Sequence, residues 1–226
     1  MAFEAGVKTV SGYLAVPPSG SGPGVLVLHA WWGLNEFFVG LCDRLAQAGF
    51  VALAPDLYGG PTASTIEEAE KLRDTHGADE EVVQTRILQA LDALRQSPVV
   101  VGDKVGLMGF SLGSAWALHI STVRPADVAA AVLFYGVGGG DFTTTHAAYL
   151  GHFAENDSWE PLDQVEALEA NLRAAGREVN FYVYPGVGHW FFEKDRPDAY
   201  DATSAELAWS RTVSFLQDAL VHPPIV

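Results

Sequence analysis

The sequence has few cysteines and few basic residues, and each shortage excludes a class of protein. Cys42 is the single cysteine in 226 residues, so neither an internal disulfide nor a zinc site with several cysteines can form. Thirteen lysines and arginines stand against 28 acidic residues, which gives a formal net charge of −15. Phosphate backbones and anionic lipids repel such a chain, so we expect neither nucleic acid nor a membrane among its partners.

Long hydrophobic runs and targeting segments are also missing. No apolar run reaches the roughly 18 residues that span a bilayer, and the first residues, MAFEAGVKTVSG, lack the pattern of a signal peptide. Hydrophobic residues make up 49% of the chain, which is enough for a large core. We find no internal repeat and no domain linker, so we expect residues 1–226 to form a single cytoplasmic domain.

Apolar runs alternate with helical patterns along the chain. Strands are expected at 7–16 (as a strand or hairpin), 24–29, 50–55, 104–109, 128–135, 147–153 and 179–185. Helices are expected at 35–49, 64–77, 79–97, 114–123, 161–176 and 199–220, with Ser64 and Glu67 in a capping box. Most strand runs are apolar throughout, as parallel sheets covered on both faces require. The pattern predicts an α/β fold: a doubly wound, mostly parallel sheet of about seven strands flanked by helices, with no large lid.

Three reactive side chains follow predicted strands in one order. Ser111 lies in GFSLG after the strand 104–109, Asp157 follows the strand 147–153, and His189 follows the strand 179–185. In open α/β sheets ligands bind beyond the carboxyl ends of the strands. The order Ser, Asp, His is that of α/β-hydrolases, in which G-x-S-x-G places the nucleophile on a sharp strand-to-helix turn. We therefore expect Ser111 to be a nucleophile, His189 its base and Asp157 the orienting acid.

Each assignment has an alternative. Ser111 is also suited to cap the helix that follows it. Glu155 and Asp163 compete with Asp157, and Glu155 is the stronger of the two because it stands nearer to the strand end. The other histidines include His29 and His152, which sit at strand ends and suit a supporting role in the site.

The sequence shows no motif for a metal or a cofactor. It contains no H-E-x-x-H, no pair of histidines at metal-ligand spacing, and no G-x-G-x-x-G that opens a helix after a strand with an acid downstream. We expect no cofactor and no metal. Cys42 falls on the helix 35–49 and is expected to be a small core residue.

Five segments together resemble the dienelactone hydrolase family of α/β-hydrolases: HAWWGLN (29–35), APDLYGG (54–60), GFSLGS (109–114), NDSWEP (156–161) and GHWFF (188–192). The resemblance implies hydrolysis of an ester or lactone and an oxyanion hole from the backbone N–H groups of Leu112 and Trp31. Aromatic residues around these segments are candidate apolar walls for the substrate: Trp31, Trp32, Tyr58, Trp190 and Phe191.

Three positions depart from that family. Its characteristic nucleophile is cysteine, where this chain has Ser111, and its members often have glutamate where this chain has Ala30. In the thiol enzymes that acid is tied to activating the cysteine, so losing both together is chemically coherent. Dienelactone hydrolases proper also bind a substrate carboxylate with arginines, one of which would stand at Glu193. Arg196, Arg73 and Arg86 are the other candidates for that charge.

These observations favour a serine hydrolase that cleaves carboxylic esters or lactones through an acyl-enzyme. A true dienelactone hydrolase (carboxymethylenebutenolidase) acting on an anionic lactone is one alternative. A non-catalytic binding protein on the same fold is another. The expected partner is a small-molecule ester or lactone, and the oligomeric state stays open between a monomer and a small homo-oligomer.

Overall fold

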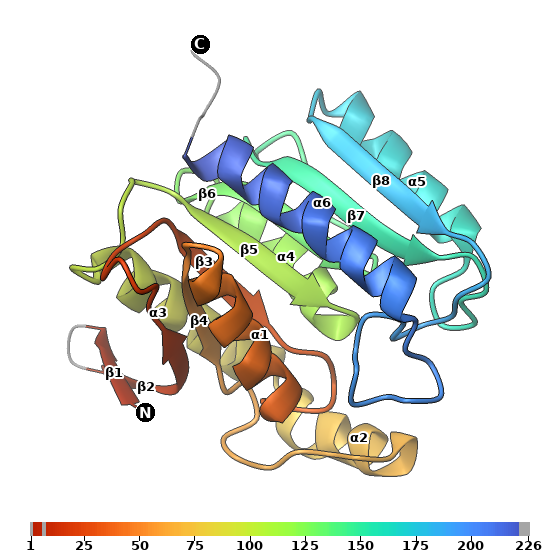
Figure 1. Cartoon of the computed structure of the whole chain (residues 1–226), viewed down its shortest axis with the longest axis horizontal. Coiled ribbons are helices and arrows are strands. Elements are labelled where there is room, and N and C mark those ends of the chain that lie inside the picture. Colours follow the sequence, from red (N-terminus) through yellow and green to blue (C-terminus); the bar gives the residue numbers. More distant parts are fainter. Residues whose placement is uncertain (1, 6–7, 222–226) are drawn as a thin grey trace. The chain divides into compact units, whose positions relative to one another are not determined.

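A computed structural model describes residues 2–5 and 8–221 of the chain (Figure 1). The chain forms two compact units, Met1–Val105 and Gly106–Val226, which are taken in turn. Within the described residues, no helix combines the length and the apolar character needed to cross a membrane.

The first unit contains a mixed sheet with the strand order β1-β2-β4-β3. Its strands are β1 (Ala2–Ala5), β2 (Lys8–Ala15), β3 (Gly24–Leu28) and β4 (Val51–Pro55). β2 pairs antiparallel with both β1 and β4, whereas β3 and β4 are parallel. The expected element 7–16 is thus the second strand of a hairpin, and β1 is additional to the strands expected from the sequence.

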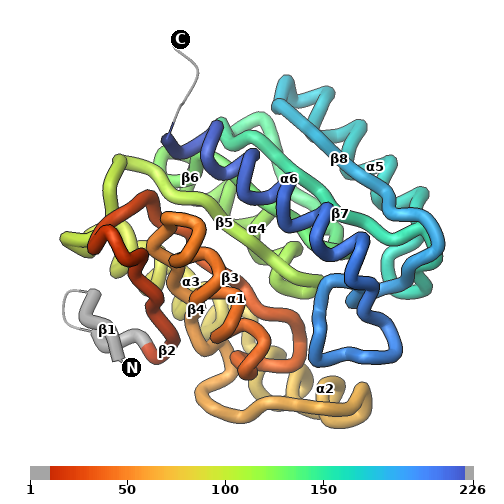
Figure 2. Tube along the Cα trace, in the orientation of Figure 1, coloured from red at the N-terminus to blue at the C-terminus, as the bar shows by residue number. Residues whose placement is uncertain are grey.

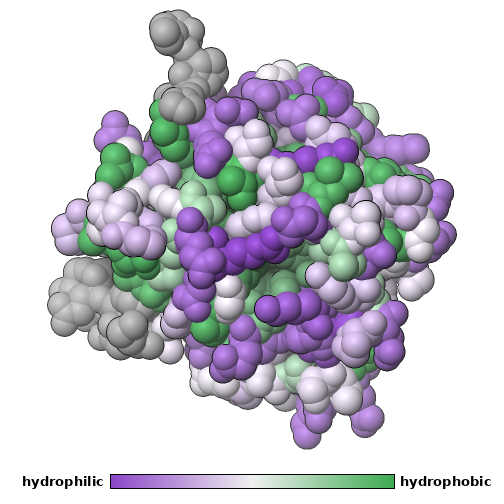
Figure 3. Space-filling model, viewed as in Figure 1, coloured by the Kyte–Doolittle hydropathy of each residue, from purple (hydrophilic) through white to green (hydrophobic). Residues whose placement is uncertain are grey.

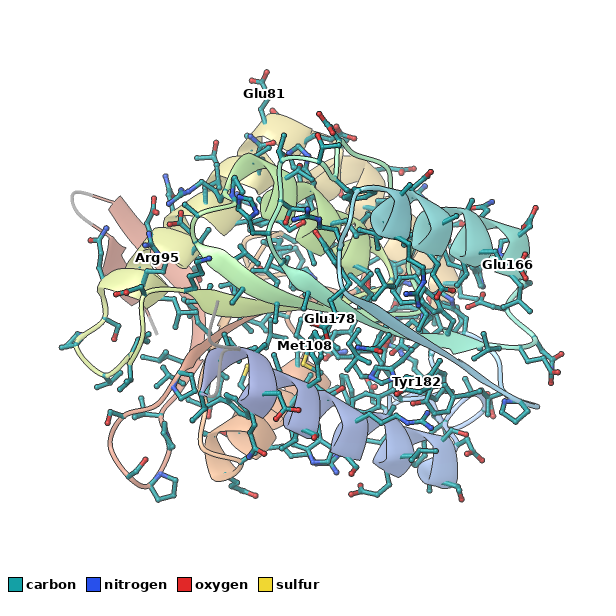
Figure 4. The ribbon with its side chains drawn as sticks, turned by 90° about the horizontal axis from the view of Figure 1, so that it is seen from above. Glu81, Arg95, Met108, Glu166, Glu178 and Tyr182 are labelled. Atoms are coloured by element: carbon teal, nitrogen blue, oxygen red, sulfur yellow. The ribbon has the colours of Figure 1, made fainter. Side chains whose placement is uncertain are left out.

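Helices cover both faces of this first sheet. α1 (Glu36–Gln47) lies on one face and α3 (Glu80–Gln96) on the other (Figures 1 and 4). Between them in sequence come α2 (Ile66–Leu72) and the π-helical turn η1 (Arg73–Gly77). The apolar face of α1 includes Cys42, which is fully buried as expected.

The capping box of α2 differs from the expected one by one residue. The hydroxyl of Thr65, not of Ser64, accepts the N–H of Glu68 at 3.3 Å, and Glu68 Oε2 accepts the N–H of Thr65 at 3.1 Å. The expected pairing of Ser64 with Glu67 is wrong because Glu68 Oε2 also accepts the N–H of Ser64, at 2.9 Å. One carboxylate therefore binds both backbone groups that precede the helix.

The second unit holds a parallel set of strands with the order β5-β6-β7-β8. They are β5 (Val105–Phe110, which begins at the boundary), β6 (Val128–Phe134), β7 (Ala148–Ala154) and β8 (Val179–Tyr184). β6 pairs parallel with β7 and β7 with β8, and the trace in Figure 2 shows these strands side by side. The helix α6 (Ala202–Leu220) lies on one face, and α4 (Leu112–Val123) and α5 (Leu162–Ala174) on the other (Figures 1 and 4).

Burial explains the apolar strand runs in this unit. Every residue of β5 and nearly every residue of β6 and β7 is buried, as a parallel sheet covered on both faces requires. β8 is last in the order, and several of its residues are exposed. Its Tyr182 projects toward α6 (Figure 4), where Arg211 stacks 3.8 Å from the centre of the ring. On the face shown in Figure 3, hydrophobic residues are interspersed with hydrophilic ones, which is ordinary for a protein surface.

The mostly parallel sheet flanked by helices, expected from the sequence, is confirmed. The strands β5, β7 and β8 of the second unit run in one direction (Figure 1), so their carboxyl ends share an edge. The loops after these three strands carry Ser111, Asp157 and His189.

Candidate active site

Ser111 occupies a strained turn between β5 and α4. Its backbone has φ 50° and ψ −116°, a left-handed conformation that a residue with a Cβ adopts only when its surroundings enforce it. The Ser111 N–H donates to the carbonyl of Phe134 at the end of β6, at 2.9 Å, and the Ser111 carbonyl accepts from Ser114 N at 2.8 Å. The side chain makes no capping hydrogen bond to the helix. Ser111 thus stands at the N-cap position of α4, but its hydroxyl does not cap the helix and is left for another partner.

Close backbone packing explains two glycines around this turn. A Cβ on Gly109 would lie 2.3 Å from the carbonyl oxygen of Gly113, and one on Gly136 would lie 2.3 Å from the carbonyl oxygen of Ser111. Both distances are far below contact, so neither position accepts a side chain. Below the turn, the buried hydroxyl of Ser114 lies 2.9 Å from the Gly109 carbonyl oxygen, joining strand and helix.

A chain of hydrogen bonds joins the three predicted residues. His189 Nε2 lies 3.0 Å from Ser111 Oγ, and His189 Nδ1 lies 2.7 Å from Asp157 Oδ2. A carboxylate only accepts, so Nδ1 carries the proton and Nε2 presents its lone pair to the serine hydroxyl. The side chains of His189 and Asp157 are 4% and 2% exposed, which shields their interaction from solvent. This arrangement can remove a proton from Ser111 and stabilise the resulting imidazolium.

Asp157 is itself held by the backbone of its loop. Its Oδ1 accepts the N–H groups of Trp159 at 2.9 Å and Glu160 at 3.0 Å, which leaves Oδ2 for His189. The loops after β7 and β8 are also bonded to each other, because the Asn156 N–H donates to the Val187 carbonyl at 3.0 Å. The acid and the base are thus positioned by one connected piece of backbone.

The two competing acids have other partners. The Glu155 carboxylate accepts the Gly186 N–H at 2.8 Å and so supports the turn after β8. Asp163 lies in the first turn of α5, where its Oδ1 accepts the N–H of Gln164 at 3.0 Å. Among these three carboxylates, Asp157 is the one bonded to His189.

Two further acidic groups lie close to these residues. Burial, together with the nearby charge of Asp157, raises the pKa of Glu160 to about 7, against the effect of the Val137 N–H. Glu193 is fully buried and accepts the Tyr135 hydroxyl at 2.7 Å. Burial and the Glu193 carboxylate raise the pKa of Tyr135 well above its ordinary value, so Tyr135 is a neutral donor to Glu193.

The expected oxyanion and wall residues fall in both units. Leu112 is the first residue of α4, where an N–H has no acceptor within the helix. In the first unit Trp31, Trp32 and Tyr58 are buried. In the second, Phe191 is fully buried against Tyr135 and Tyr184, whereas Trp190 is partly exposed. Of the expected wall residues in the second unit, Trp190 alone retains surface for a ligand.

The two strand-end histidines are buried and neutral. Burial lowers the pKa of His29 to about 4; its Nδ1 donates to Ala30 O at 2.7 Å and its Nε2 accepts from Leu57 N at 3.2 Å. Burial lowers the pKa of His152 to about 3. The His152 ring nitrogens bond to the hydroxyls of Tyr184 at 2.9 Å and Thr212 at 3.0 Å. Both histidines connect neighbouring segments of their own unit.

Trp159, Tyr135 and Glu160 lie near His189 and Asp157 but were not predicted from the sequence. Trp159 and Glu160 lie inside the NDSWEP segment, and their spacing from Asp157 suits a turn in which a carboxylate accepts the N–H groups two and three residues on. Tyr135 ends an apolar run, and nothing in the sequence distinguishes it from a core residue. Among the residues that the structure covers, no group of three or more His, Cys, Asp or Glu side chains could hold a metal ion.

Comparison with known proteins assigns the family. Residues 10–220 match the model of the dienelactone hydrolase family. "Protein usf" of Aquifex pyrophilus is 34% identical, covering 96% of this chain and 97% of the relative, and a "Putative carboxymethylenebutenolidase" of Aquifex aeolicus is 33% identical with the same coverage. A crystal structure of a dienelactone hydrolase-like promiscuous phosphotriesterase from metagenomic libraries superposes with a TM-score of 0.84 at 25% identity, covering 97% and 96% of the two chains.

These matches cover nearly the whole chain and agree with the parallel sheet, the helices on its faces and the order of the loops. The chain has the α/β-hydrolase fold, belongs to the dienelactone hydrolase family, and is a hydrolase acting on ester bonds.

Proposed function

We propose that the chain is a serine hydrolase that cleaves carboxylic esters or lactones through an acyl-enzyme. The observation that carries the proposal is the line of hydrogen bonds from Ser111 Oγ through His189 to Asp157, built on a serine at φ 50°. In this proposal residues 1–226 act as a single domain, consistent with a family match that spans residues 10–220.

The reaction begins with His189. Its Nε2 takes the hydroxyl proton of Ser111 while the oxygen attacks the ester carbonyl, and Asp157 stabilises the imidazolium that forms. The N–H of Leu112 binds the developing oxyanion, with the N–H of Trp31 as the second donor that the family resemblance implies. His189 then gives its proton to the leaving alcohol oxygen, and the acyl group stays on Ser111. In the second half, His189 takes a proton from water as the water oxygen attacks the acyl-enzyme, and returns it to Ser111 Oγ as the acyl–oxygen bond breaks and the acid is released.

Serine in place of cysteine fits the surroundings of the nucleophile. A hydroxyl is not held as a resting anion and needs only an adjacent base. At Glu193, where an arginine would bind a substrate carboxylate, the structure has a buried acid bonded to Tyr135. These features favour uncharged esters over the anionic lactone of a dienelactone hydrolase proper.

Trapping the nucleophile tests the proposal. A fluorophosphonate should label the wild-type chain once, at Ser111, and should not label Ser111→Ala. Ser111→Ala should lose p-nitrophenyl ester hydrolysis by about 10⁶-fold in kcat, as in other serine triads. Absence of labelling would favour a binding protein. Hydrolysis of dienelactone far faster than of any neutral ester would favour the carboxymethylenebutenolidase alternative.

A further inference from the structure

Two tryptophans stand beside the catalytic histidine in the second unit. The Trp159 ring centre is 6.4 Å from that of His189 and 5.9 Å from that of Trp190. Trp190 itself lies 4.9 Å from His189, with the rings nearly perpendicular at 85°. Trp159 is 45% exposed although it is among the largest apolar side chains, so much of its ring remains available for contact.

The position of Trp159 is fixed by the same carboxylate that orients the base. Asp157 Oδ1 accepts a hydrogen bond from the backbone N–H of Trp159, and Asp157 Oδ2 accepts one from His189 Nδ1. Trp190 follows His189 directly and has φ 66°, which a bulky residue adopts only under constraint. Both indoles therefore lie beside the imidazole on backbone whose position is constrained.

The chemistry says which part of a substrate meets these rings. His189 Nε2 has to approach the leaving oxygen to within hydrogen-bond distance in order to protonate it. The alcohol part of the ester is attached to that oxygen, whereas the carbonyl oxygen points to the Leu112 N–H. Aromatic rings pair at centre-to-centre distances of about 4.5–7 Å, so a ring on the leaving oxygen is within reach of indoles placed this close to His189.

We infer that Trp159, with Trp190, binds the alcohol portion of the ester and makes the enzyme selective for aromatic leaving groups. This inference rests on the proposed serine mechanism. Trp159 then acts in the acylation of Ser111, while the alcohol is still attached, and not in the hydrolysis of the acyl-enzyme.

The test compares two acetates that give the same acetyl-enzyme. Trp159→Ala should lower kcat/KM for phenyl acetate by about 3- to 10-fold, the range of an aromatic pair, and should change kcat/KM for trifluoroethyl acetate by less than twofold. Trp159→Phe should restore most of the phenyl acetate rate. The phenol leaves before deacylation and neither water nor methanol carries a ring, so the partition of the acetyl-enzyme between water and added methanol should stay unchanged in both variants.

Leu207→Ala is the matched control, because Leu207 is 46% exposed on α6 and is not among the site residues. It should leave both acetates unaffected. Each variant is first titrated with fluorophosphonate so that rates refer to active enzyme.

Three outcomes would overturn the inference. An equal loss on both acetates would show that Trp159 only supports the Asp157 loop, and no loss on either would show that it does not contact the substrate. A change in the partition of the acetyl-enzyme between water and methanol would show that Trp159 acts in deacylation instead of acylation. If the wild type is labelled at Ser111, these results reject the inference alone; if it is not labelled, the proposed function fails with it.

Discussion

Replacing Asp157 by Asn separates the role of its charge from its role in shaping the loop. Oδ1 accepts two backbone N–H groups, at 2.9 and 3.0 Å, while Oδ2 lies 2.7 Å from His189 Nδ1. An asparagine keeps its oxygen on the two backbone donors, because the opposite orientation would set its NH₂ group against both of them. The NH₂ group then faces Nδ1.

That orientation reverses the tautomer of the imidazole. Nδ1 must accept from the amide, so the proton moves to Nε2, which faces Ser111 Oγ and can no longer accept its proton. The same change in another serine triad lowers kcat by about 10⁴-fold, equivalent to roughly 5.5 kcal/mol of transition-state stabilisation. We expect Asp157→Asn to lose a similar factor in kcat on p-nitrophenyl acetate.

The assay is steady-state hydrolysis by correctly folded protein, with the unfolding midpoint in urea measured for each variant. Glu155→Gln is the control, because Glu155 bonds to Gly186 N rather than to His189. It should retain activity within a few-fold. An Asp157→Asn variant with more than a tenth of wild-type kcat, or a Glu155→Gln variant that is the less active of the two, would refute the assignment of the acid.

Four more outcomes are expected. Cys42 is buried and burial raises the pKa of its thiol, so Cys42→Ala should keep kcat/KM within a few-fold and iodoacetamide should not inactivate the enzyme; substrate-protected inactivation would contradict this. Burial lowers the pKa of His152 from about 6.5 in the unfolded chain to about 3 in the folded one, so its contribution to the free energy of unfolding is complete above pH 6.5 and should fall by about 2 kcal/mol by pH 5. His152→Gln should make the free energy of unfolding in urea depend less on pH over this range. Burial raises the pKa of Glu160 to about 7 beside Asp157, so the pH profile of kcat/KM should contain an ionisation near pH 7 that Glu160→Gln removes; an unchanged profile would reject this. Because the buried acid Glu193 stands where the family's arginine would bind a substrate carboxylate, a neutral methyl ester should be cleaved about 10- to 150-fold faster than its matched carboxylate; a salt-sensitive preference for the carboxylate would reverse the conclusion.

Parallel topology made it possible to predict from the sequence that Ser111, Asp157 and His189 lie close together. Once 104–109, 147–153 and 179–185 are identified as strands of one parallel sheet, the residues that follow them must share an edge. Periodicity and composition were sufficient for that step, and each strand was found to within two residues of its observed bounds. The choice of Asp157 over Glu155 depended on position in the turn, and the hydrogen bond to His189 agrees with it.

The features that escaped prediction depend on side-chain direction and local backbone conformation. Phe191 follows two residues after His189 and looked like a wall for substrate, yet its ring is fully buried against Tyr135 and Tyr184. Trp159 lies in the NDSWEP segment and was not among the predicted wall residues, yet it is partly exposed beside the imidazole. A sequence gives the position of such residues along the chain but not the rotation that turns one inward and the other outward.

Strained backbone in the second unit lies directly after β5 and β6 and in the loop after β8. Among the described residues, Ser111, Tyr135 and Trp190 are the non-glycine positions with positive φ. Each such conformation costs about 1–3 kcal/mol, so the three together destabilise the fold by an amount comparable to the net free energy of unfolding of a small domain. The surroundings that hold them are rigid: Ser111 N bonds to the end of β6, and Tyr135 N bonds to the carbonyl of buried His152 on β7.

The positions of these strained residues are independent support for the proposed role of the site. Packing alone gives no reason to force a tyrosine and a tryptophan into left-handed backbone, since glycine or asparagine would adopt it at lower cost. The Tyr135 ring lies 4.9 Å from His189 and its hydroxyl is bonded to Glu193, while the Trp190 ring lies 4.9 Å from the imidazole at 85°. Tyr135 and Trp190 thus confine the ring of His189, and Ser111, the third strained residue, presents the hydroxyl whose hydrogen bond His189 accepts. Backbone strain at these positions is the expected consequence of fixing one imidazole between a buried carboxylate and a serine on a sharp turn.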